Sequence, residues 1–174
     1  MTAEARVSGD VAGRPAASSQ TVAAEGMLAG LVGAATIALW FLVLDTLQGR
    51  PLYTPSVLGA AIFRGGAGLD HPETLPISIE MVVVFTWVHL LHFALFGVAA
   101  AQLVVVAERN PNVGFGILLL FVVFEFGFVA ACLLFAEPVL HALAWPAVLV
   151  GNLLAAAAMV FTFRRRHPHL VILP

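Results

Sequence analysis

A carboxylate and two histidines inside apolar runs are the residues of this chain most suited to chemistry. Glu125 lies within the apolar run 114–136, and His89 and His92 lie three residues apart in the run 81–107. That spacing places both imidazoles on one face of a helix. An unpaired charge near the centre of a bilayer costs about 3 kcal/mol or more. We therefore expect Glu125 to contact a partner, and His92, at a similar predicted depth, is the partner we expect.

Three further polar residues extend this cluster toward one end of the predicted helices. Asp45 lies near the end of the first apolar run, and Glu137 and His141 are four residues apart around the start of the last one. Lipid disfavours such groups, so we expect the polar faces of the helices to meet inside a bundle. The sequence therefore predicts a candidate metal site of His89, His92 and Glu125, with His141, Glu137 and Asp45 as possible further ligands.

Several chemistries fit this arrangement. Imidazole and carboxylate suit iron, copper, zinc or manganese, although the Glu-x-x-His pairs of di-iron bundles are missing from the sequence. A transmembrane histidine also suits haem or chlorophyll, and a chain of Glu125 and the histidines suits proton or ion movement. The fourth interpretation, which we favour, is structural. A neutral Glu125–His92 pair would join two helices, a contact worth about 0.6 kcal/mol on average in membrane proteins.

Composition indicates a membrane protein. The chain has 174 residues, of which 61% are hydrophobic and only 10% are charged, whereas soluble domains carry about 25% charged residues. Cys132 is the only cysteine, so neither an internal disulfide nor a cysteine-based zinc site is expected. The formal charge is -2 and no basic tract is interleaved with aromatics, so no nucleic-acid partner is expected.

Four segments are apolar over about the 20 residues that a membrane span needs. They are residues 27–47, 81–107, 113–136 and 139–163. The short links between the later segments predict neighbouring antiparallel helices, so the expected fold is an all-α integral membrane protein with an up-down bundle of four transmembrane helices. We expect one transmembrane domain over residues 23–166, between a disordered tail over 1–22 and a short tail over 167–174.

The loop between the first two spans predicts a short helix. Thr54-Pro55 is a helix start signal, with Thr54 as the N-cap residue. The apolar content of residues 57–63 predicts that this helix lies on, or dips into, the outer membrane surface.

Positive charge predicts the orientation, because arginines gather on the cytoplasmic side. Six of the eight basic residues fall on one side of the predicted spans, namely Arg6, Arg14, Arg109, Arg164, Arg165 and Arg166. We expect both termini to be cytoplasmic, in a cytoplasmic (inner) membrane of bacterial type.

The sequence contains no nucleophile with a positioned base and no phosphate-binding glycine loop, so an enzyme is not the favoured class. We expect an accessory subunit of a larger energy-transducing complex, respiratory or photosynthetic, whose partners are the lipid bilayer and other membrane subunits. One alternative is a membrane oxidoreductase that uses the His/Glu cluster to bind iron, copper, zinc or haem. A small proton or ion transporter is the third possibility.

Overall fold

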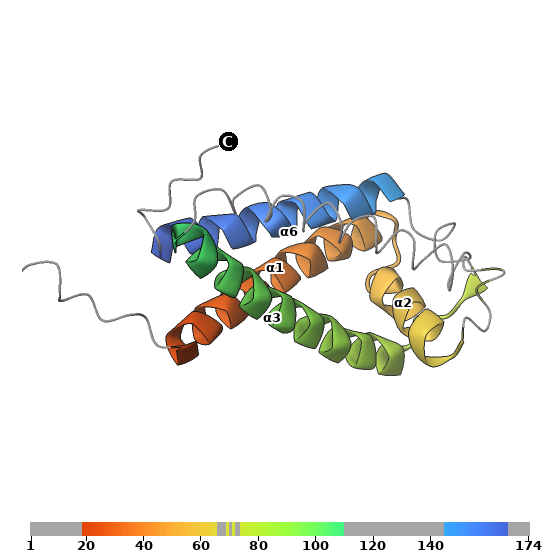
Figure 1. The fold of residues 1–174 in the computed structure, drawn as a ribbon. Coiled ribbons are helices and arrows are strands. Elements are labelled where there is room, and N and C mark those ends of the chain that lie inside the picture. Colours follow the sequence, from red (N-terminus) through yellow and green to blue (C-terminus); the bar gives the residue numbers. More distant parts are fainter. Residues whose placement is uncertain (1–18, 66–68, 70, 72–73, 110–144, 167–174) are drawn as a thin grey trace, which may run out of the picture.

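A computed structural model of the chain describes residues 19–65, 69, 71, 74–109 and 145–166. Their regular structure consists of four helices (Figure 1): α1 (Ser19–Leu47), α2 (Tyr53–Phe63), α3 (Ile79–Arg109) and α6 (Trp145–Arg166). Three of these, α1, α3 and α6, are long and apolar enough to cross a membrane. These helices confirm an all-helical fold and indicate a membrane protein.

The predicted spans agree with the helices wherever the structure describes them. The predicted spans 27–47 and 81–107 lie inside α1 and α3, and residues 145–163 of the fourth lie inside α6. The predicted span 113–136 and residues 139–144 lie outside the described residues. Helix α1 begins at Ser19 rather than at the predicted domain start, residue 23. Apolar composition marks only the apolar part of a helix, whereas the helix itself continues through the polar Ser19 and Gln20.

Helix α1 is central, and both α3 and α6 pack against it (Figure 1). The helices share an apolar core at the end where α1 begins and where α3 and α6 end. This core consists of Val22, Ala29, Ala101, Val104, Met159 and Phe163. The ends of the chain's described part, Ser19 and Arg166, therefore lie at the same end of the bundle, and Arg166 Nη1 lies 3.7 Å from Glu25 Oε1 of α1.

The crossing of α1 and α3 depends on glycine. A Cβ atom on Gly26 would lie 2.5 Å from the carbonyl oxygen of Gly97 and 2.6 Å from the Cα of Val98. One on Gly97 would lie 2.7 Å from the backbone nitrogen of Gly30. Real Cβ atoms do not approach backbone this closely, so only glycine lets the two helices touch here. Small residues are what lets two helix backbones approach this closely.

Beyond the crossing, α1 and α3 diverge, and α2 lies between their far ends (Figure 1). Gly59 of α2 faces the backbone of Met81 in the first turn of α3; a Cβ there would lie 2.5 Å from the Met81 carbonyl oxygen. A second apolar cluster covers the other side of α2, where Val57 and Leu69 are buried and Val148 of α6 packs against them. The short helix expected in this loop is therefore present, and it fills the space between the diverging ends.

A tryptophan of α1 forms a hydrogen bond with α6. The indole Nε1 of Trp40 donates a hydrogen bond to the carbonyl oxygen of Ala147 over 2.8 Å. Gly151 lies one turn further along α6, and a Cβ atom on it would lie 2.8 Å from Trp40 Cδ1. The glycine therefore makes room for the indole ring, and the ring's polar edge finds an acceptor inside an otherwise apolar contact.

Candidate functional site

His89 of α3 points toward α1. Its Nε2 lies 3.3 Å from the carbonyl oxygen of Ala34, a residue with no exposed surface. A carbonyl oxygen only accepts, so the Nε2 position carries the proton and donates. The ring also lies between Phe85 and Phe93, with ring centroids 5.6 and 4.7 Å away. His89 is thus held by a neighbouring helix on one edge and by aromatic rings on its faces.

His92 is placed differently from His89, although both were predicted on one face. Its side chain is exposed, and its ring meets Phe93 edge-on at a centroid distance of 6.1 Å. Residue 92 is close to the middle of the candidate span 79–106. A spacing of three separates two side chains by about 60° around a helix, which here is enough to place one imidazole against α1 and the other outside that contact.

Asp45 is buried, with 3% of its surface exposed, and it binds the start of α2. Its Oδ2 accepts from the backbone N–H of Thr54 over 2.8 Å, and its Oδ1 accepts from the Thr54 hydroxyl over 2.7 Å. The predicted role of Thr54 as N-cap is therefore wrong: the N-cap position is Leu52, in the left-handed conformation with φ of 68° and no side-chain cap bond. The capping acceptor comes from α1 instead, because the tight turn brings Asp45 over the free N–H groups of α2.

The candidate ligands do not assemble within the described residues. No group of three or more His, Cys, Asp or Glu side chains is close enough to hold a metal ion in that part of the chain. Asp45 binds Thr54 and His89 binds the α1 backbone. Glu125, Glu137 and His141 lie outside the described residues, so the predicted contact between Glu125 and His92 stays a prediction.

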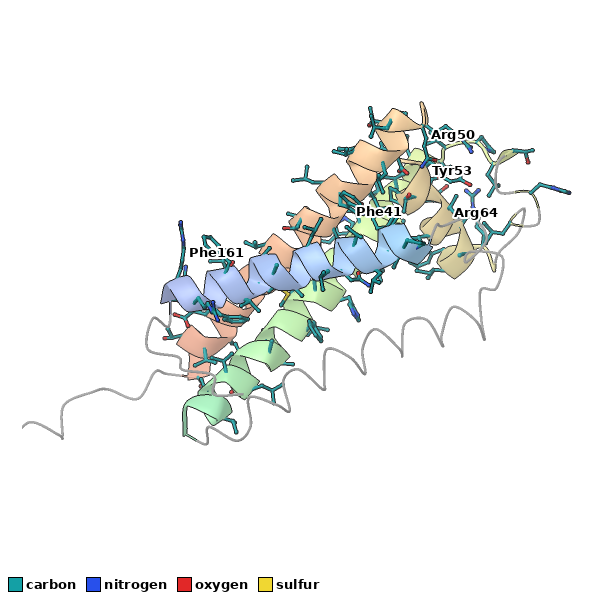
Figure 2. All side chains as sticks on the ribbon, turned by 90° about the horizontal axis from the view of Figure 1, so that it is seen from above. Phe41, Arg50, Tyr53, Arg64 and Phe161 are labelled. Atoms are coloured by element: carbon teal, nitrogen blue, oxygen red, sulfur yellow. The ribbon has the colours of Figure 1, made fainter. Side chains whose placement is uncertain are left out.

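Polar contacts that the sequence did not predict fix the connections around α2 (Figure 2). Arg50 Nη2 donates to the carbonyl oxygen of Leu75 over 2.7 Å, and the Arg50 guanidinium lies 4.0 Å from the ring centroid of Tyr53. The Ser56 hydroxyl oxygen accepts from the backbone N–H of Ser78 over 2.9 Å. The three-residue spacing of Arg50 and Tyr53 is a sequence signal that would have indicated their stacking contact. The sequence carries no such signal for the carbonyl of Leu75, because only the fold brings it to Arg50.

Comparison of the chain with protein-family models, with curated proteins and with solved structures finds no match. The class of protein is therefore inferred from the structure of this chain. Its described part is helical, with three apolar helices that could span a membrane, a short helix between the far ends of α1 and α3, and polar groups that join one helix to another.

His89 makes one hydrogen bond and packs its ring against two others, and the effects of these two kinds of contact on stability can be measured separately. His89→Phe keeps a ring between Phe85 and Phe93 and removes only the bond to Ala34, so it is expected to cost about 0.6 kcal/mol. His89→Ala removes the ring as well and is expected to cost about 2 kcal/mol or more. Thermal unfolding midpoints of the purified protein in mild detergent measure both. A large loss from His89→Phe would show that the imidazole does more than join two helices.

Proposed function

We propose that this chain is a structural subunit of a larger, energy-transducing membrane complex. The proposal rests on what the polar side chains of the candidate site contact. Two of the candidate ligands, His89 and Asp45, bind a backbone carbonyl and a threonine at 3.3 and 2.7 Å. Both contacts join one helix to another, which is a structural role.

A long exposed ridge on α3 supports an interaction role. Its side chains are spaced by four residues and are 49–72% exposed, namely Ile79, Val83, Trp87, Leu91 and Leu95. Such i±4 ridges pack into the grooves of neighbouring helices. The connection between α1 and α2 is short, residues 48–52, and the four predicted spans leave few residues outside the membrane. With little mass outside its helices, the chain would gain its activity from a host complex, and we propose a respiratory or photosynthetic one.

The decisive experiment is the size and subunit composition of the tagged full-length protein, extracted from its native membrane in mild detergent. We expect a large particle with reproducible partner subunits. A Trp87→Ala, Leu91→Ala variant is expected to lose these partners at least tenfold. The matched control is Leu39→Ala on α1, whose side chain is 61% exposed but does not belong to the ridge. Recovery of one to a few copies of the chain alone, at native abundance, would refute the proposal.

If that refuting result is obtained, the predicted cluster of His89, His92 and Glu125 should be tested next. Metal analysis and absorption spectra of the protein and of its His92→Ala and Glu125→Ala variants would test the metal- or haem-dependent oxidoreductase. Ion flux into liposomes, with Glu125→Gln as the comparison, would test the transporter.

We further propose that residues 113–136 form a fourth span. Helix α3 ends beside the start of α1, whereas α6 begins beside α2, at the opposite end of the bundle. The residues between Arg109 and Trp145 must therefore connect the two ends. Reporter fusions after Arg109, Glu137 and Arg166 test this topology: we expect the first and third on the cytoplasmic side and the second outside. A reporter after Glu137 on the same side as the other two would contradict both the span and the orientation.

A further inference from the structure

The last turn of α6 carries three consecutive arginines with different surroundings. Arg166 lies 3.7 Å from Glu25 of α1, so a carboxylate offsets its charge. The Arg165 guanidinium lies back over the ring of Phe161, 4.5 Å from its centroid. Arg164 and Arg165 are exposed, and neither forms an ion pair within the described residues. Two guanidinium groups are therefore available to an anion at this end of α6.

An apolar surface leads directly to these arginines. Residues spaced by four and three along α6 form one exposed stripe, namely Pro146, Val150, Leu153, Ala157, Val160 and Arg164. The part from Leu153 to Arg164 is about 16 Å long at 1.5 Å per residue. One leaflet of a bilayer's hydrocarbon core is about 15 Å thick. The stripe thus has the length of one acyl chain and ends in positive charge.

From this continuity we infer that the end of α6 is a binding site for an anionic phospholipid, with its phosphate on Arg164 and Arg165 and an acyl chain along Val160, Ala157 and Leu153. Guanidinium groups bind phosphate oxygens through paired N–H donors. The helix carbonyls place only about -0.5 charge at this terminus, which two guanidinium groups outweigh. Phe161, which is 57% exposed, holds Arg165 at the boundary between apolar surface and water. This site is independent of the proposed host complex.

The test uses the full-length protein in detergent micelles, with native mass spectrometry to count bound lipids. The probes are short-chain phosphatidylglycerol and phosphatidylcholine with identical acyl chains. A basic residue near an anionic surface contributes about fivefold to binding, so the two arginines predict a preference of about 30-fold for phosphatidylglycerol. The Arg164→Gln, Arg165→Gln variant is expected to lose this preference, and Arg164→Lys, Arg165→Lys to keep most of it.

Two controls make the result specific. Arg64 is an exposed arginine at the opposite end of the bundle, paired at 3.2 Å with Glu80, and Arg64→Gln is expected to leave the preference unchanged. Inorganic phosphate at the lipid's concentration is expected not to displace it. An unchanged preference in the double glutamine variant overturns the inference. Complete displacement by inorganic phosphate also overturns it, because the ligand would then be a soluble phosphate rather than a lipid.

Discussion

Gly97→Ala is expected to destabilise the bundle by about 1–3 kcal/mol, although the same change inside an isolated helix stabilises it by about 1 kcal/mol. The opposite sign follows from the crossing of α1 and α3. The new methyl group would lie 2.8 Å from the Cα of Gly30, and backbone cannot rotate away as a side chain can. The two helices would have to separate along the whole contact. Gly97→Leu is expected to cost more than the alanine change.

Thermal unfolding in mild detergent, followed by circular dichroism, measures both variants. Ala99→Leu is the matched control, because Ala99 lies two residues further along α3 and is exposed. Its effect is expected to stay within about 0.5 kcal/mol. A rise in the unfolding midpoint of Gly97→Ala would show that the α1 and α3 backbones do not touch.

Asp45→Ala is expected to release the start of α2 at a cost of about 2–4 kcal/mol. The change leaves two donors of Thr54, its N–H and its hydroxyl, without their acceptor, and Thr54 is only 4% exposed. Thr54→Val removes the hydroxyl but keeps the N–H bond, so it is expected to cost about half as much. The double variant is expected to cost less than the two single costs added together, because both changes remove the same hydroxyl bond.

Trypsin cleavage after Arg64 gives a local measurement of this release, since Arg64 directly follows α2. We expect Asp45→Ala to accelerate that cleavage severalfold relative to cleavage after Arg166. Thr46→Val serves as the control, because the Thr46 hydroxyl bonds within its own helix, to Leu42 over 2.6 Å. Equal cleavage rates in the wild type and Asp45→Ala would show that this carboxylate does not hold α2 in place.

Much of the fold follows from the sequence because a long apolar run is a simple signal for a long helix. Long apolar runs predicted α1, α3 and the larger part of α6, and the Thr54-Pro55 pair predicted the start of α2 two residues too late. The sequence left the packing of these helices open. It did not predict which glycines meet, because the pairing of Gly26 and Gly30 with Gly97 depends on where two helices cross.

The candidate site was less predictable. Asp45 was expected among possible metal ligands, but in the structure it caps α2, a role set by the turn at 48–52 that brings two helix ends together. Local spacing predicted one face of α3 for His89 and His92, but in the structure His89 contacts α1 and His92 is exposed. Periodicity gives the direction of a side chain around its own helix. It does not give the position of the neighbouring helix, which decides whether that side chain is covered.

The bond between Trp40 and Ala147 joins residues that are 107 positions apart, and this separation has a consequence for synthesis. At about 5–20 residues per second, a ribosome needs roughly 5–20 s to reach the acceptor after it has made the donor. Until then the surface of α1 that receives α6 is not covered by it. The contact between α1 and α3 can form earlier. The newly made chain therefore passes through a stage in which α1 and α3 are packed together at their glycines and α6 has not yet joined them.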